Sequence, residues 1–136
     1  MVFIDLLDNC NIVLIENQPS LKNPIMKSVQ MLLFTYFIVR GINDKLIISD
    51  LKLISASNKL KKCQKIEKFK DRSNNYKDRK KLSIDYCRYL IDKDKIKLEL
   101  FNNHSKKDDL ADCLLQGIYY LESLKYEFQL MTSKLS

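Results

Sequence analysis

The alternation of apolar and polar positions predicts five regular elements. A short β-branched run at residues 11–16 (N-I-V-L-I-E) predicts a strand buried on both faces. An almost continuous apolar stripe predicts a helix over residues 25–39, and an Ile- and Leu-rich stretch predicts a second strand within residues 45–55. Helical spacing returns over residues 77–91 and from residue 106 to about residue 127.

The segments between these elements have their own signals. Residues 17–24 contain both prolines and predict a loop, with Pro24 near the first turn of the following helix and Gly41 as the C-cap of that helix. Residues 59–75 contain few apolar residues that could pack against a core, which predicts a loop or a frayed helix. We expect residues 2–9 to be the end of an amphipathic helix and the stretch before residue 106 to be a short polar connection.

Strand, helix, strand and then further helices is the order of an α/β protein with a mostly parallel sheet. The length of 136 residues predicts one domain covering residues 1–136. Because two strands are too few for an independent sheet, we expect the strand at residues 11–16 to have further neighbours.

Composition excludes several classes of protein. Two glycines leave no Gly-rich phosphate loop and therefore no nucleotide cofactor site of that kind, and four scattered cysteines with a single His104 do not form a zinc site. The longest apolar run, residues 31–39, is about half of what a membrane span needs. No secretion signal opens the chain, so an intracellular protein with reduced thiols and no membrane association is expected.

Positive charge is concentrated in one segment. Residues 59–81 contain eleven Lys or Arg and three acidic residues, a net charge of +8 in a chain whose total is +7. Such a patch suits a polyanion, because Lys and Arg neutralise phosphates and release counterions. The alternative is a solvated Lys-rich loop with no ligand.

Three acidic residues stand where solvation alone explains them poorly. Glu16 ends the first predicted strand, and Asp109 and Asp112 are three residues apart, so they share one face near the start of the last helix. Carboxylates of this kind are ligands for Mg²⁺, or for Mn²⁺. The competing interpretation is a capping box from Ser105 to Asp108 with acids that favour the helix N-terminus.

Four segments together resemble a known family. They are V-L-I-E-N-Q-P-S-L-K-N-P-I-M-K (residues 13–27), S-A-S-N-K-L (55–60), Y-K-D-R-K-K-L-S-I (76–84) and K-K-D-D-L-A-D (106–112). In this order they resemble the RuvC-type Holliday-junction resolvases, especially the branch found in poxviruses and other large DNA viruses.

The resemblance implies a ribonuclease-H-like mixed sheet flanked by helices and a Mg²⁺-dependent endonuclease that cuts four-way DNA junctions as a homodimer. It implies catalytic and metal-binding roles for Glu16, Asp109 and Asp112. The DNA-binding residues that it implies are Lys59, Lys77, Arg79, Lys80 and Lys81. The expected setting is viral DNA replication or recombination, in the host cytoplasm or nucleus.

The sequence departs from the family at one point. The family's fold begins with a strand that carries its first catalytic Asp, and no such strand precedes Val2, so the domain is expected to be truncated at its N-terminus relative to the family. A piece of a longer gene product, a misplaced start codon and a loss of catalysis all remain open. The rival hypotheses are therefore a resolvase-fold module that binds branched DNA without cutting it, and a helical interaction protein whose basic segment only aids solubility.

Assembly is a further expectation. The helix predicted over residues 25–39 has more apolar residues than one sheet face can cover, which favours a two-fold homodimer through part of this helix. A helix sandwiched in the core is the alternative.

Overall fold

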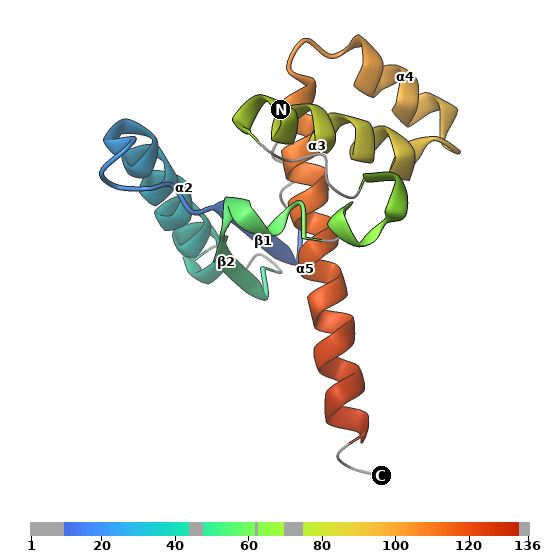
Figure 1. Cartoon of the computed structure of the whole chain (residues 1–136). Coiled ribbons are helices and arrows are strands. Elements are labelled where there is room, and N and C mark those ends of the chain that lie inside the picture. Colours follow the sequence, from blue (N-terminus) through green and yellow to red (C-terminus); the bar gives the residue numbers. More distant parts are fainter. Residues whose placement is uncertain (1–9, 44–47, 62, 70–74, 134–136) are drawn as a thin grey trace. The chain divides into compact units, whose positions relative to one another are not determined.

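The computed structural model describes residues 10–43, 48–61, 63–69 and 75–133, and these form two units that divide after Ser55. Together they contain four α-helices and a two-stranded parallel sheet, which confirms the α/β class (Figure 1). The helix end predicted at residues 2–9 lies outside the described residues. No described helix is long and apolar enough to cross a membrane.

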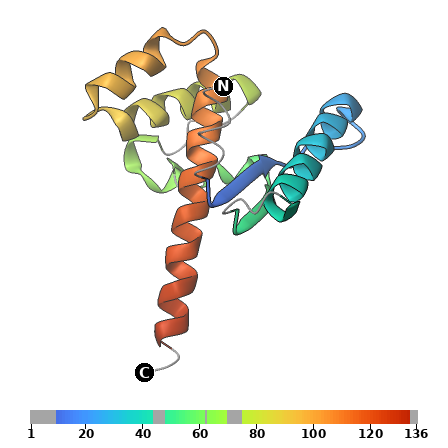
Figure 2. The ribbon, with the colours of Figure 1, turned by 180° about the vertical axis from the view of Figure 1, so that it is seen from behind.

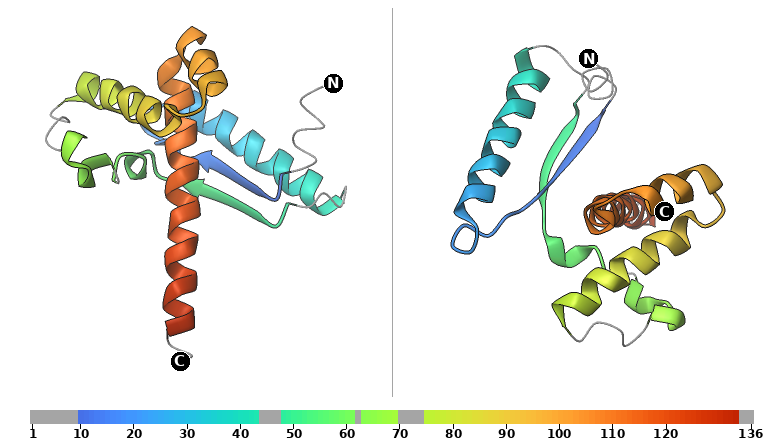
Figure 3. Two further views of the ribbon diagram at one scale, coloured as in Figure 1. Left: turned by 90° about the vertical axis from the view of Figure 1, so that its right-hand side faces the viewer. Right: turned by 90° about the horizontal axis from the view of Figure 1, so that it is seen from above.

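The first unit is a strand, a helix and a parallel strand: β1 (Ile12–Glu16), α2 (Pro24–Asn43) and β2 (Asp50–Ile54). The strands pair in register from Ile12 opposite Asp50 to Glu16 opposite Ile54, and Figure 3 shows them side by side and pointing in the same direction. Both predicted strands and their parallel arrangement are therefore confirmed. Because the strands are parallel, Glu16 and Ile54 end at the same edge of the sheet.

The predicted burial of the first strand on both faces is not observed. All five residues of β1 are partly buried, and in the described part of the chain β2 is its only partner. Helix α2 lies along one side of this pair (Figure 3). A two-stranded sheet is not stable by itself in water, so the apolar residues of β1 depend on the packing of α2.

Helix α2 begins at Pro24, which confirms the predicted place of Pro24 in its first turn, but the helix does not end at Gly41. The Asn23 side chain accepts a hydrogen bond from the Met26 N–H (3.3 Å), which starts the helix, and Gly41 lies inside the helix without a left-handed φ. A methyl group on Gly41 would lie 3.6 Å from Ile48 Cβ, an ordinary contact. Glycine is therefore not required there, and the helix continues to Asn43.

The second unit is helical. Three short 3₁₀ turns, η1 (Ala56–Asn58), η2 (Cys63–Lys65) and η3 (Glu67–Phe69), precede α3 (Tyr76–Ile91), α4 (Lys95–Asn103) and α5 (Lys107–Ser133). Helices α3 and α4 lie beside the N-terminal half of α5, whose C-terminal half extends beyond them (Figure 2). The first part of α5 is therefore the scaffold of this unit.

The described part of the basic segment before α3, residues 59–61 and 63–69, belongs to the core, which corrects the prediction of a loop or frayed helix over residues 59–75 for these positions. Residues 62 and 70–74 of that prediction lie outside the described residues. Leu60, Cys63 and Phe69 are buried, and Ile66 packs against them. These four residues are spaced by three, and a 3₁₀ helix with three residues per turn places such residues on one side. Phe69 lies edge-on to the Tyr86 ring of α3 (5.5 Å between centroids).

Helix α4 replaces the predicted polar connection. Asp94 caps its first turn by accepting a hydrogen bond from the Lys97 N–H (3.1 Å), and Phe101 is buried against Cys87 and Ala111. The sequence hides this helix because apolar residues alternate with charged residues at positions 96–100, a pattern typical of a strand.

Replacing Phe69 by Ala tests the core of the second unit. The ring is 2% exposed, so the cavity should lower the free energy of unfolding by about 3 to 5 kcal/mol. Urea unfolding followed by circular dichroism measures the change. Lys65→Ala removes an exposed side chain from the same segment and should change the free energy of unfolding by less than about 0.5 kcal/mol. Equal stability of Phe69→Ala and the unmodified protein would contradict a folded segment.

Candidate functional site

The first two turns of α5 present three aspartates. Asp108 and Asp109 lie in the first turn, where the positive end of the helix dipole favours negative charge, and Asp112 lies one turn further along. The predicted shared face of Asp109 and Asp112 follows from this helix. Just before it, His104 Nδ1 accepts a hydrogen bond from the Lys106 N–H (3.2 Å).

Asp112 forms an ion pair with Lys59. The Lys59 ammonium donates a hydrogen bond to Asp112 Oδ2, and both side chains are largely covered, at 19% and 28% exposure. Helix α5 contacts η1, which precedes Lys59 directly and brings it to this carboxylate. The negative charge of the partly buried Asp112 is therefore balanced by Lys59, a side chain of the same unit.

Asp108 forms a second ion pair, with Lys80 of α3. Lys80 Nζ lies 2.5 Å from Asp108 Oδ2. This hydrogen bond lowers the pKa of Asp108 and raises the pKa of Lys80. The pair is open to solvent, so salt screens it and it contributes little to the stability of the fold.

The two predicted groups of acidic residues fall in different units. Glu16 lies at the carboxyl end of β1 in the first unit, where its Oε1 accepts a hydrogen bond from Gln18 Nε2 (3.1 Å). The loop that follows is fixed to α2, because the buried Gln30 accepts a hydrogen bond from the Gln18 N–H (2.7 Å). Across the described ranges, no three or more His, Cys, Asp or Glu side chains form a group that could hold a metal ion.

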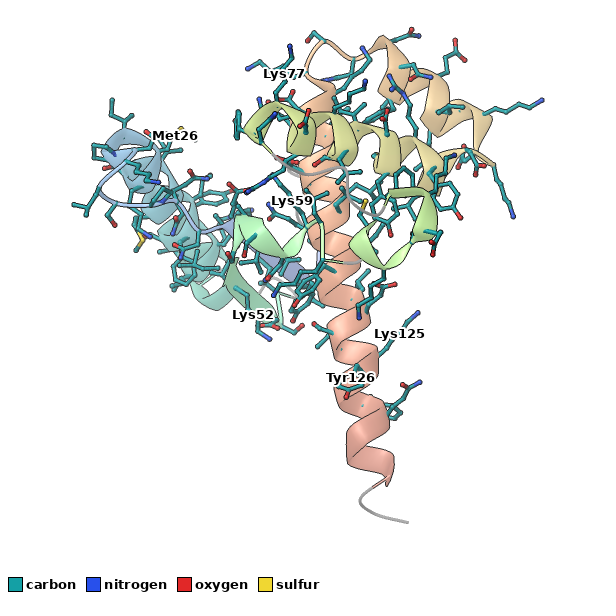
Figure 4. The ribbon with its side chains drawn as sticks, viewed as in Figure 1. Met26, Lys52, Lys59, Lys77, Lys125 and Tyr126 are labelled. Atoms are coloured by element: carbon teal, nitrogen blue, oxygen red, sulfur yellow. The ribbon has the colours of Figure 1, made fainter. Side chains whose placement is uncertain are left out.

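Three of the predicted DNA-binding residues lie on α3 with exposed side chains: Lys77, Arg79 and Lys81. Lys77 and Lys59 are labelled in Figure 4, which also shows Lys125 and Tyr126 on the part of α5 that extends beyond the other helices. Among the residues that the structure describes, neither Lys77 nor Lys81 has an acidic partner. The five predicted cations thus divide into two that pair with α5 and three that do not.

A pocket of about 370 Å³ opens beside these cations. We call it the Tyr76 pocket. Its walls include Lys59 and Leu60 from the segment after η1, and Tyr76, Arg79, Lys80 and Ser83 from α3. All of them belong to the second unit. The sequence did not single out Tyr76; an aromatic residue directly before a Lys- and Arg-rich stretch was the available signal.

The core-facing side of α5 is formed by Ala111, Leu115, Gln116 and Tyr120, which are buried, whereas Leu114 is exposed. Residues 111, 115 and 116 share a face at helical spacing, so the buried Gln116 lies among the apolar residues of this side.

The chain is similar to a viral protein. It is 47% identical over 118 residues to an uncharacterized protein of Acanthamoeba polyphaga mimivirus, a match that covers 81% of this chain and 28% of that protein. The chain thus spans less than a third of the length of the relative that it matches. No protein-family model matches the chain. No solved structure matches it either.

The Lys80–Asp108 pair gives a pH prediction. A carboxyl group whose pKa is lowered by folding stabilises the fold above the ordinary value of about 3.9, and this contribution is lost as the pH falls through the lowered pKa. For Lys80 the contribution is present below about 10.4 and is lost as the pH rises through the raised pKa. In Lys80→Met, the Asp108 pKa should return toward its ordinary value, as measured by NMR titration of the carboxyl carbon.

Asp94 is the internal control for this titration. Its pKa is also lowered, but by hydrogen bonds from Lys97, so Lys80→Met should leave it unchanged. An Asp108 pKa that is the same with and without Lys80 would show that the ion pair is absent in solution.

Proposed function

We propose that this chain carries the catalytic residues of a Mg²⁺-dependent endonuclease that resolves four-way DNA junctions, with a ribonuclease-H-like fold. The single observation that carries the proposal is the pair of acidic residues on α5: Asp109 and Asp112 share one face at the start of this helix. Glu16, which the resemblance adds, ends a parallel strand of the first unit. The ends of parallel strands and helix N-termini are common locations for phosphate chemistry in α/β proteins.

The donor chemistry of these residues fits Mg²⁺. Carboxylate oxygens are the hard ligands that this ion prefers. The Lys59 ammonium bonds to Asp112 Oδ2, so the ion would share the Asp112 carboxylate with Lys59 or take its place. Asp109 and Asp112 would hold the ion from α5, and the resemblance adds Glu16 as a further ligand. When bound, Mg²⁺ supplies an activated water and stabilises the leaving oxygen of a phosphodiester.

Lys59 has a second role in this proposal. While it bonds to Asp112 it neutralises a carboxylate that would otherwise repel the DNA backbone. Lys59 also lines the Tyr76 pocket, so it would contact a phosphate next to the cleaved bond. Lys77, Arg79, Lys80 and Lys81 would bind neighbouring phosphates from α3.

The similarity to a mimivirus protein supports a viral setting, in which branched DNA arises during genome replication and recombination. The alternative proposal is a module that binds branched DNA without cutting it. The two ion pairs of α5 favour this alternative, because they hold Asp108 and Asp112 on lysines.

Acid substitutions separate cutting from binding. Glu16→Gln and Asp112→Asn should each abolish Mg²⁺-dependent cleavage of a labelled four-way junction, because each replaces a charged carboxylate ligand of the ion by a neutral amide. Binding of the junction in Ca²⁺, measured by gel shift, should stay the same or become tighter as repulsion of phosphate falls. Equal loss of cutting and binding would exclude the proposed site. Junction binding without cutting by the unmodified chain would favour the alternative.

Two lysines provide the opposite control. Lys77→Ala combined with Lys81→Ala should weaken binding to every DNA probe and reduce the salt dependence of binding, by about 0.9 in slope for each phosphate that is no longer neutralised. Lys93→Ala with Lys95→Ala removes the same charge from exposed positions in the turn before α4 and at its first residue, and should change the slope little. If the two double substitutions weaken DNA binding equally, the lysines of α3 contribute only through the net charge of the chain.

A homodimer completes the proposal. Helix α2 exposes Ile25 (76%) and Leu32 (72%), and apolar residues of this kind are typical of subunit interfaces. We expect a dimer by sedimentation at micromolar concentration and a shift to the monomer in Leu32→Glu. Lys22→Glu introduces the same acidic side chain at an exposed position outside α2, so it serves as the control and should keep the dimer. A monomeric unmodified chain would contradict this part of the proposal.

A further inference from the structure

The Tyr76 pocket has the size of a small-ligand site. Its volume of about 370 Å³ lies in the range of pockets that hold molecules as large as a mononucleotide. Leu60 and Ser83 are buried and contribute to its walls, whereas Tyr76 is 74% exposed. The pocket therefore combines a buried wall with an exposed aromatic ring.

The three cations that line the pocket differ in whether an acidic side chain pairs with them. Lys59 and Lys80 each bond to an aspartate of α5. Arg79 is exposed, and in the described part of the chain no acidic side chain pairs with it. A guanidinium binds a phosphate through two parallel hydrogen bonds, so Arg79 is the natural phosphate ligand among the three.

The Tyr76 ring is held at the same pocket. Lys80 Nζ lies 5.4 Å from the ring centroid, and Lys80 is itself fixed by Asp108. The cation attracts the ring and occupies one side of it, while the high exposure of the side chain leaves aromatic surface for another partner. Aromatic rings next to basic residues bind unpaired bases by stacking.

We propose that the Tyr76 pocket binds one unpaired nucleotide of a DNA strand, with the phosphate on Arg79 and the base stacked on Tyr76. The inference rests on the proposed function for its ligand class, DNA, and it does not require cleavage. The chain should therefore prefer DNA strands with unpaired bases, which are exposed where base pairing is interrupted. A base inside a duplex cannot reach the ring, because both of its faces are stacked.

Two labelled strands test this assignment with the full chain. One probe is a fluorescein-labelled ten-nucleotide oligodeoxythymidine, and the other is an abasic strand of the same length and label, which keeps the phosphates and lacks the bases. Fluorescence anisotropy gives the dissociation constant of each. Tyr76→Ala should weaken binding of the thymidine strand by about five- to a hundredfold and leave the abasic strand unchanged. Tyr76→Phe keeps the ring and should bind both strands as the unmodified chain does.

Arg79→Ala tests the phosphate end of the pocket. It should weaken binding of both strands by about tenfold, because the phosphate ligand is removed from each complex. Lys93→Ala removes the same charge at an exposed position in the turn before α4 and serves as the matched control, with little effect expected. Circular dichroism and the urea midpoint verify that each variant is folded.

Three outcomes would overturn the proposal. They are equal binding of the two strands by the unmodified chain, an equal effect of Tyr76→Ala on both strands, and a loss in Tyr76→Phe as large as in Tyr76→Ala. Failure of the proposed cleavage shows itself separately, as an intact junction in Mg²⁺, and leaves these binding constants unaffected. The pocket and the catalytic assignment are thus tested independently.

Discussion

The second unit depends on the burial of Phe69 and Leu115 between the 3₁₀ segment, α3 and α5. Both side chains are 2% exposed, and they join residues more than forty positions apart in the sequence. Ordering a Lys-rich segment costs conformational entropy, and this small apolar cluster offsets that cost. The positions of Lys59 and of the residues on the first turns of α3 follow from it.

The cations that this core brings together differ in whether they form ion pairs with aspartates of α5. The aspartates of α5 take Lys59 and Lys80, so part of the positive charge is neutralised within the unit. Lys77, Arg79 and Lys81 remain exposed on α3. The five predicted DNA-binding cations are therefore not equivalent, and the three among them that have no acidic partner within the described residues all lie on α3.

The sequence predicts the elements that have a clear period and misses those whose period is unusual. The parallel strands and helices α2, α3 and α5 follow from apolar spacing, and the spacing of Asp109 and Asp112 follows from α5. Helix α4 is missed because Ile96, Leu98 and Leu100 alternate as in a strand. The partners of Asp112 and Asp108 could not be predicted, because Lys59 and Lys80 are distant in sequence and reach α5 only through packing. Tyr76 directly precedes a Lys- and Arg-rich stretch, which is a signal in the sequence, but the pocket that it lines is a property of the fold.

The Lys59–Asp112 pair is where the two proposals for this chain diverge. A partly buried carboxylate needs a cation, and a lysine ammonium and Mg²⁺ satisfy the same need with different consequences. If the ammonium stays on Asp112 when DNA binds, the pair is structural and the chain acts by binding. If Mg²⁺ shares or takes the carboxylate, Lys59 is released toward a phosphate at the pocket that it lines. The same side chain would then change from balancing an aspartate to balancing the substrate, which links metal binding to DNA binding through one residue.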